Sequence, residues 1–267
     1  PADFHDRSLL APRGVLQIGR DGEESLADAF EREFAGSGVA MERCGHAEMS
    51  ARVPGLRQDW QVGLWSEACY DIDVASLHGG YLRAARRAGA QLVTNAALER
   101  ARWQEGAWDI ETRAGSFRAS MLVNAAGAWA DDIARRADVS PIGIQPNRRT
   151  IVQLVVDPPA SSNLPLVIGL DESFYFKPEA GGRLWLSPHD ETPCPPCDAA
   201  PEELDIAIAI DRLQQAVDWK IEKVEHSWAG LRSFAADRLP VIGVDPDMPA
   251  FFWLAGQGGF GIQTAPA

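Results

Sequence analysis

The sequence predicts an α+β fold in which an α/β part is interleaved with a mixed or antiparallel sheet flanked by helices. Segments typical of strands and of helices alternate along the 267 residues without an internal repeat. The segment MLVNAAG, residues 121–127, takes a short apolar run through small residues into a helical segment, as in α/β proteins. Residues 142–188 are extended and proline-punctuated instead, which indicates an antiparallel arrangement.

The first half of the chain predicts strands and helices in alternation. Trp108, Ile110 and Thr112 alternate with charged neighbours, which is typical of a half-buried strand. Asp73 can cap the start of a helix that Gly89 can end. The strands expected here cover residues 10–19, 90–103 and 106–127, with a turn at 113–116, and the helices cover 23–38, 73–90 and 129–137.

The second half predicts a hairpin, one long helix and a closing pair of strands. Ile206, Ile210 and Leu213 recur at helical spacing after Pro201, which suits the first turn of a helix. The chain then ends on a strand, a turn with four glycines between Gly256 and Gly261, and a small-residue segment compatible with a helix. The expected hairpin covers 173–188 around 180–182, the helix 201–221, and the strands 224–243 and 250–256.

Composition excludes several classes of protein. A formal net charge of −13 and a pI near 4.8 argue against a nucleic-acid partner, because no basic patch is available to meet phosphates. No apolar stretch approaches the length of a membrane span, and the first residues lack the pattern of a signal peptide. Four cysteines in a chain of this length do not make a disulfide scaffold, so a cytoplasmic location is expected.

One cysteine pair leaves an alternative open. Cys194 and Cys197 form a C-P-P-C segment, and Cys44 with His46 provides two more soft ligands of the kind that zinc prefers. Only one spaced pair is present, whereas a zinc signature has two, so a surface loop carrying two thiols is favoured and no metal site is predicted.

Three segments in order resemble a known family. These are VNAAGAWADDIA, HSWAGLRSFAADRLPVIG and GQGGFGIQTAPA, and together they resemble the D-amino acid oxidase-like (DAO) superfamily of FAD-dependent oxidoreductases. The likeness is nearest to the D-arginine dehydrogenase branch of D-amino acid dehydrogenases, and YDIDVASLHGGYLRAARRAGAQL, DESFYFKPEAG and PEELDIA share it.

The resemblance implies two interleaved domains and a chain shortened at both ends. The family's N-terminal G-x-G-x-x-G turn and its acidic partner for the adenosine ribose have no counterpart here, and most of the helix after the last glycine turn is missing as well. A substrate domain is expected from 1–70 and 141–228, and an incomplete FAD-binding domain from 71–140 and 229–267.

The resemblance also assigns cofactor-binding residues for FAD. Leu98 corresponds to a backbone contact near the adenine, and the turn at Ala125, Ala126 and Gly127 lies near the pyrophosphate. The flavin-side positions are Pro240, Gly258, Gly259, Phe260, Gly261, Ile262 and Gln263.

Five positions are expected to contact the substrate. Arg232 and Tyr175 match the family positions that fix a substrate carboxylate, for which a bidentate guanidinium and a phenol hydroxyl are well suited. Arg148 matches a second position near the ligand, and the Gly259 carbonyl is available to the substrate amine. Val15 stands where the D-arginine branch has a glutamate that pairs with the substrate guanidinium, so neutral or apolar side chains are expected to be preferred.

The implied reaction is the oxidative deamination of a D-amino acid. A hydride passes from Cα to flavin N5, and water hydrolyses the imino acid to a 2-keto acid, with oxygen or a quinone-type carrier as the final acceptor. No catalytic residue is assigned, because the reaction requires orientation rather than a His or carboxylate pair. Two alternatives remain open: a glycine- or sarcosine-type amine oxidase of the same superfamily, and a non-catalytic fragment that binds no flavin.

Overall fold

A computed structural model describes residues 7–265, and the chain divides into two compact units. The first unit comprises residues up to 78 with 149–190 and 200–229, and the second comprises 79–148, 191–199 and residues from 230 onward. The chain passes from one unit to the other after residues 78, 148 and 229. The sequence predicted domain boundaries after residues 70, 140 and 228. Residues 191–199, assigned above to the substrate domain, group with the second unit. The substrate and FAD roles of the units stay predictions.

The first unit is built on a mixed sheet with the strand order β10–β13–β12–β11–β2–β4–β3, and β14 (Thr192–Pro193) and β15 (Lys220–Phe234) both pair with β10. Neighbouring strands are antiparallel except β2 and β11, which run parallel. A small separate ladder joins β1 to β5. The strands are β1 (Leu10–Pro12), β2 (Val15–Arg20), β3 (Glu42–Cys44), β4 (Trp60–Ser66), β5 (Tyr70–Ile72), β10 (Gln145–Asp157), β11 (Leu166–Gly169), β12 (Tyr175–Glu179) and β13 (Arg183–Ser187).

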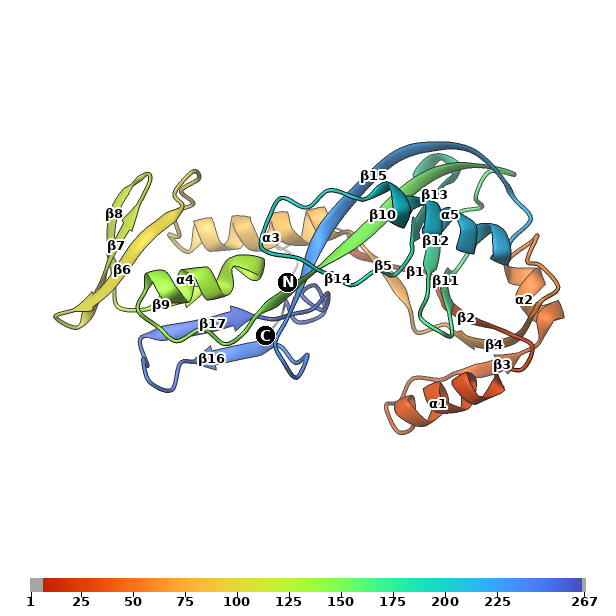
Figure 1. The fold of residues 1–267 in the computed structure, drawn as a ribbon, viewed down its shortest axis with the longest axis horizontal. Helices are drawn as coiled ribbons and strands as arrows, with labels where there is room; N and C mark the ends of the chain where they lie inside the picture. The colour runs from red at the N-terminus through yellow and green to blue at the C-terminus, as the bar shows by residue number, and fades with distance from the viewer. Residues whose placement is uncertain (1–6, 266–267) are drawn as a thin grey trace. The chain divides into compact units, whose positions relative to one another are not determined.

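Alternation along the strands gives this sheet two different faces. On β12, Phe176 and Pro178 are buried, whereas Tyr175, Lys177 and Glu179 are half-buried on the other face. The buried face packs in one apolar cluster with α2 (His46–Arg52) and α5 (Glu203–Ala216), and α5 lies against β13 (Figure 1). At the far end of the sheet, α1 (Glu24–Phe34) covers the opposite face of β4.

The second unit contains two three-stranded sheets and two helical segments in contact with them. The first sheet has the order β16–β17–β9 and the second β6–β7–β8. The small-residue turn at η1 (Gly127–Trp129) leads into α4 (Ala130–Arg136), which packs on the core shared by Phe251 and Trp253 (Figure 1). The strands are β6 (Leu98–Gln104), β7 (Ala107–Thr112), β8 (Gly115–Ala119), β9 (Leu122–Asn124), β14 (Thr192–Pro193), β16 (Val241–Val244) and β17 (Phe251–Ala255).

Trp108 joins the two sheets of this unit. Its indole is fully buried and donates to the Ala250 carbonyl at 2.9 Å, while its ring meets Phe251 edge-to-face at 6.1 Å. Burying a side chain of this size stabilises the folded unit by roughly 3 kcal/mol.

Three elements contain a boundary between the two units within their sequence. They are α3 (Val74–Arg87), β10 and β15 (Lys220–Phe234).

The structure corrects several element boundaries. The single strand expected at 10–19 is divided, because Gly14 has φ +71° and the amides of Arg13 and Gly14 both donate to the Cys69 carbonyl. Residues 90–97 are not part of a strand, and α5 ends at Ala216 rather than continuing to 221. The helix α2 and the strands β3, β4 and β5 were not predicted, because their sequences lack a clear period.

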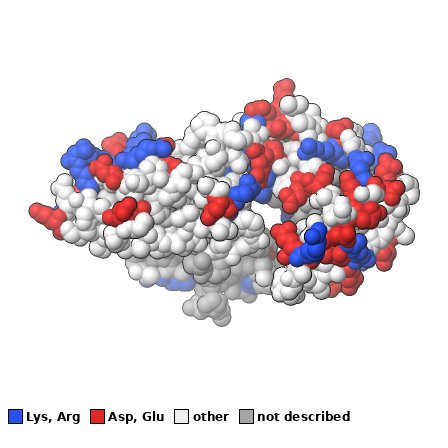
Figure 2. Space-filling model, turned by 60° about the horizontal axis from the view of Figure 1, so that its bottom comes forward, with Lys and Arg blue, Asp and Glu red and all other residues white. Residues whose placement is uncertain are grey.

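The described residues contain no helix suited to span a membrane, and the one face drawn in Figure 2 carries charges of both signs. Within the described part of the chain, no helix is both long enough and apolar enough to cross a membrane. On the face drawn in Figure 2, acidic and basic side chains are interspersed. The ion pairs of Arg43 with Asp28 and Glu31 are of this exposed kind.

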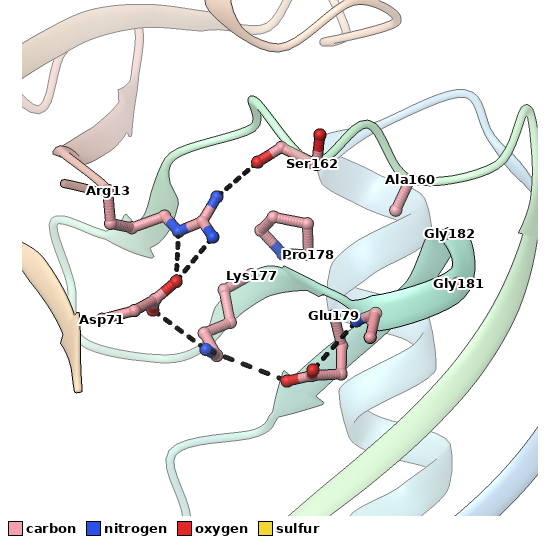
Figure 3. A pocket seen from close by; sticks show the side chains of 10 residues that line it. Arg13, Asp71, Ala160, Ser162, Lys177, Pro178, Glu179, Gly181 and Gly182 are labelled. Carbon is pink, nitrogen blue, oxygen red and sulfur yellow. Dashed lines mark hydrogen bonds and ion pairs between the residues drawn. The ribbon is translucent and has the colours of Figure 1, made fainter. Parts of the chain in front are cut away.

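A cluster of charged side chains on the open face of the first unit joins three separate segments of the chain. Arg13 donates to Asp71 through Nε at 2.8 Å and Nη2 at 2.5 Å, and through Nη1 to the carbonyls of Ser162 and Leu164. Lys177 reaches the other oxygen of Asp71 at 3.0 Å (Figure 3). These side chains, with Glu179, line a cavity of about 450 Å³. Two cations face two carboxylates, so the cluster is internally neutral and structural.

We predict that Asp71→Asn lowers the free energy of unfolding at pH 7 by about 1.5–3 kcal/mol, the range for hydrogen bonds to a charged group. Burial raises the pKa of Asp71, but hydrogen bonds from Arg13 and Lys177 outweigh burial and hold the pKa below its ordinary value. Because the pKa of Asp71 is lower in the folded than in the unfolded protein, the ionised carboxylate stabilises the fold at pH values above the unfolded-state pKa. This stabilisation is lost as the pH falls through the folded-state pKa.

The difference between wild type and variant should therefore shrink as the pH is lowered below about 4. Urea midpoints measured at several pH values test this. Asp28→Asn is the control in the same unit, since the Asp28 side chain is 58% exposed and Arg43 keeps Glu31 as a partner. Equal effects of the two substitutions would contradict the structural role of the cluster.

Candidate functional site

The glycine turn after β17 is held against the end of β15. Gly256, Gly258 and Gly259 all have positive φ, at 73°, 55° and 103°. The Gly258 amide donates to the Ser233 carbonyl at 2.9 Å, and Gln257 forms a bridge with Phe234. The turn is therefore pinned in place by backbone bonds of the same unit.

Glycine is required at Gly258 for space as well as for conformation. A Cβ there would lie 2.4 Å from Cε1 of the Phe234 ring, which is itself 5% exposed. The Arg238 guanidinium lies 4.0 Å from the centroid of the same ring, and Arg238 is paired with Glu191 at 2.8 Å. The buried Phe234 ring would have to shift to admit a methyl group at Gly258.

Arg232 lies beside the next glycine of the turn. A Cβ on Gly259 would be 3.0 Å from the Arg232 Nε and 3.1 Å from its Cζ, so the guanidinium lies directly beside the Gly259 backbone. The side chain is half-buried, and within residues 7–265 it makes no hydrogen bond or ion pair. The structure thus brings together two residues predicted to bind substrate, and leaves the charge of one of them available to an anion.

Unused polar groups gather along the same turn. The amides of Gly259, Gly261 and Ile262 donate to no backbone acceptor among the described residues. Ser233, whose carbonyl accepts the Gly258 amide, has a buried Oγ without a hydrogen-bond partner among the described residues. The successive unpaired amides of Gly261 and Ile262 can meet electronegative atoms, and a buried orphan atom is costly unless a ligand or water meets it.

The remaining flavin-side positions surround this turn. Phe260 is 54% exposed, and its carbonyl accepts from the Gln263 amide at 3.0 Å. Pro240 is half-buried directly before β16. The segment after the glycines makes turns at 261–263 rather than a helix within the described residues.

Asn124 organises the small-residue turn, a role that the sequence did not reveal. Its amide nitrogen donates to the Ala130 carbonyl at 2.8 Å, and its Oδ1 accepts from the Ala126 amide at 3.3 Å. Gly127 follows with φ +56°, and no atom lies within 4 Å of the position that a Cβ would occupy. Ala125 is exposed, so backbone on this side is open to a ligand. The sequence feature that could have indicated this role is an asparagine placed directly after the apolar run at residues 121–123.

Leu98 begins β6 and lies beside α4. Leu98, Trp129, Ile133 and Arg136 are among the residues that line a cavity of about 370 Å³ in the second unit. The Leu98 carbonyl already accepts a bond from the Arg136 side chain at 2.8 Å. The cavity, rather than that carbonyl, is the feature here that can receive a flat ligand.

Tyr175 and Val15 share the open face of the sheet in the first unit. Tyr175 is opposite Ile168 on β11, and Ile168 is opposite Gln17 on β2, so these three side chains form one row. Val15 is in the neighbouring row of the same face. The Tyr175 ring meets His189 edge-to-face at 5.6 Å, and its hydroxyl bonds no described residue.

Gln17 is the polar residue that the sequence analysis missed. It is 8% exposed and interrupts the apolar strand VLQIG on the row of Tyr175. The sequence feature that could have indicated Gln17 is a single amide side chain inside an apolar strand, since such residues are rarely buried without a partner or a role.

Arg148 lies on β10, the strand that pairs with the β15 strand of Arg232. It is half-buried near the start of β10, opposite Thr192 of β14.

Among residues 7–265, no group of three or more His, Cys, Asp or Glu is placed to hold a metal ion. Cys44 is buried beside Met49 and close to Gly63.

Comparison with known proteins identifies the family. Residues 4–267 match the DAO family of FAD-dependent oxidoreductases, and the chain belongs to that family. A glycine oxidase of Pseudomonas aeruginosa is 28% identical over 82% of this chain and 59% of its own length. Human dimethylglycine dehydrogenase is 30% identical over 46% of this chain and 15% of its own length. The chain thus covers only part of these relatives.

Solved structures share the fold. The glycine oxidase of Geobacillus kaustophilus superposes with a TM-score of 0.83 at 23% identity, over 98% of this chain and 71% of that chain. The FAD-bound L-α-glycerophosphate oxidase of Mycoplasma pneumoniae superposes with a TM-score of 0.86 at 18% identity, over 96% and 71%. The resemblance to the superfamily is therefore confirmed, and the nearer likeness to one D-amino acid dehydrogenase branch stays a prediction.

The residues of the second unit fit the family's FAD. Its polar edges require hydrogen-bond donors, which the amides of Gly259, Gly261 and Ile262 provide. The open backbone at Gly127 and the cavity beside Leu98 suit close approach of a large flat molecule.

We predict that Gly258→Ala destabilises the second unit by about 2–4 kcal/mol, because overpacking against Phe234 adds to the strain of a positive φ. It should also weaken FAD binding. Urea unfolding and FAD titration by visible absorbance measure the two effects. Gly243→Ala on β16 is the matched control: its φ is not positive and a Cβ there meets nothing within 4 Å. Unchanged stability in the first variant would contradict the packing described.

Proposed function

We propose that the protein containing this chain oxidises a carboxylate-bearing amine, with a neutral D-amino acid as the first candidate. The observation that carries the proposal is Arg232, a half-buried guanidinium without a partner among the described residues, beside the Gly259 backbone. A lone cation of this kind is a receptor for an anionic group, and its planar fork matches a carboxylate.

The chain's own residues bind and orient the substrate in this proposal. Arg232 holds the carboxylate, and the Gly259 carbonyl accepts a hydrogen bond from the substrate amine. The family resemblance assigns a carboxylate-binding role to Tyr175 as well, and the Tyr175 hydroxyl bonds no described residue. Arg148 is proposed near the ligand, in a supporting position.

FAD, when bound, supplies the two-electron acceptor for the hydride that leaves the substrate Cα. The segments proposed to hold it are Leu98, Ala125, Ala126, Gly127, Pro240 and the turn from Gly258 to Gln263. The resulting imino acid is hydrolysed by water to a 2-keto acid. Positioning of the Cα–H bond is the contribution that these residues make, since a well-oriented pair avoids a large entropic cost. Oxygen or a quinone-type carrier completes the cycle.

The preference for a neutral side chain rests on Val15 and its surroundings. Val15 offers no charge, and Gln17 in the next row is neutral as well. An ion pair in a dry pocket is what discriminates for a cationic substrate, so its absence favours apolar or neutral side chains.

A second candidate is a glycine- or sarcosine-type oxidation. The specific observation in its favour is similarity to proteins named glycine oxidase and dimethylglycine dehydrogenase. The same Arg232 would hold the carboxylate of such substrates. The third candidate is a chain that binds no flavin and is not catalytic.

Anaerobic reduction of the FAD-loaded protein distinguishes the candidates. We expect a structured flavin spectrum that bleaches faster with D-Leu, D-Met or D-Phe than with glycine or sarcosine, and slowest with D-Arg or D-Lys. Faster bleaching by sarcosine or glycine would support the second candidate instead. Failure to retain FAD would support the third. Val15→Glu should improve the D-Arg rate relative to the D-Leu rate, and Leu10→Glu, at an exposed position, is its control.

We also predict that Arg232→Ala raises the substrate KM by about 10- to 100-fold, because a charge-assisted hydrogen bond contributes about 1.5–3 kcal/mol. Arg232→Lys should recover only part of the loss, since an ammonium cannot form the bidentate pair. FAD affinity, measured separately, should change little. A KM within twofold of wild type in the alanine variant would contradict the assignment.

A further inference from the structure

The loop from Cys194 to Cys197 is a built pair of thiols that the proposed reaction does not use. Cys194 follows β14 directly, and its amide donates to the Pro146 carbonyl at 3.1 Å. The second cysteine is exposed, whereas the first is half-buried. Both are free thiols in the second unit.

The two thiols are three residues apart on one short loop, and the chain bends at residues 196–197 between β14 and α5. Burial, the largest cause, raises the pKa of Cys194, and the neighbouring Cys197 thiol adds to this. The two intervening prolines have fixed φ angles, which limits the number of conformations open to the loop. A short cysteine spacing of this kind is compatible with reversible disulfide chemistry.

A metal is a poorer explanation for the pair. Zinc takes four protein ligands in a structural site, and among residues 7–265 no third His, Cys, Asp or Glu joins these two in a metal-binding group. Cys44 and Cys69, the other thiols, lie in the first unit, where burial raises the pKa of each.

We propose that Cys194 and Cys197 are a peroxide-oxidisable pair that closes to a reversible intramolecular disulfide. The Cys197 thiolate, the exposed member, attacks hydrogen peroxide and breaks the O–O bond, giving a sulfenic acid and hydroxide. The Cys194 thiolate then attacks the Cys197 sulfur, which forms the S–S bond and releases a second hydroxide. In sum, two thiols lose two electrons and two protons, and peroxide becomes two waters.

The disulfide would fix the loop beside a predicted ligand residue. Thr192 of β14 is opposite Arg148 of β10, and Asn147 is opposite Pro193. Closing the ring restrains the chain immediately after this ladder. The Cys194 amide, bonded to Pro146, should therefore exchange its hydrogen more slowly in the oxidised protein.

The test is graded peroxide treatment of the reduced chain, followed by thiol alkylation and peptide mapping without reductant. We expect the alkylatable thiols to fall from the four present to two, the link to map to Cys194–Cys197, and dithiothreitol to restore all four. The Cys44→Ser/Cys69→Ser double variant should close the same disulfide. Cys194→Ser should leave a sulfenic acid on Cys197 that dimedone traps, and Cys197→Ser should abolish the fast oxidation.

Three outcomes would overturn the proposal. The first is overoxidation of Cys197 to sulfinic acid without linkage in the wild-type chain. The second is a link that joins Cys194 or Cys197 to Cys44, to Cys69 or to another chain. The third is stoichiometric zinc in the purified protein that protects the pair from alkylation. Hydrogen exchange at Cys194, compared between the reduced and oxidised forms, provides a readout independent of any flavin or substrate.

Discussion

The close contact of the glycine turn with the end of β15 is the constraint on which the candidate site depends. Gly258 fits against the Phe234 ring where a methyl group has no room, and Gly259 passes beside the Arg232 guanidinium. Backbone bonds from the turn to Ser233 and Phe234 hold it in this position. The same contact that requires glycine therefore places side by side amides and a cation that have no partner among residues 7–265, which is an arrangement for binding rather than for stability.

The first unit separates stability and recognition by the alternation of its strands. One face of the sheet carries the apolar cluster with α2 and α5, and the other presents Tyr175, Lys177 and Glu179. On the open face, the charges of Arg13 and Lys177 are neutralised by those of Asp71 and Glu179, so that part of the face is structural. The row of Gln17, Ile168 and Tyr175 has no such internal compensation, and we consider it the part available to a ligand.

Family membership agrees with the two groups of residues that we consider available to a ligand. These are Arg232 with the glycine turn, and the row of Gln17, Ile168 and Tyr175. The family uses FAD, and the second unit supplies donors and open backbone suited to it. We propose that substrate preference within the family depends on Val15 and its neighbours rather than on the fold. The thiol pair of the CPPC loop is independent of these groups and responds to a different chemistry.

The sequence by itself determined the family, the helices with a clear period and the hairpin around residues 180–182. Local signals were sufficient there: α1, α3 and α5 lie within the predicted ranges, and the turn at 113–116 joins β7 to β8. Glycine spacing and the order of three motifs likewise indicated the flavin-side turn. These features depend on contacts between residues near one another in the chain.

Only the tertiary structure decided which of those residues are neighbours. Three arrangements follow from strand pairing and register. Arg232 lies beside Gly259 with no partner among residues 7–265, Asn124 ties the small-residue turn to α4, and Gln17 shares a row with Tyr175. The division of the first strand at Gly14 arose from a bond to Cys69, a residue more than fifty positions away. Register and long-range hydrogen bonds have no local signature, because they are selected by burial of the whole sheet rather than by the preference of any segment.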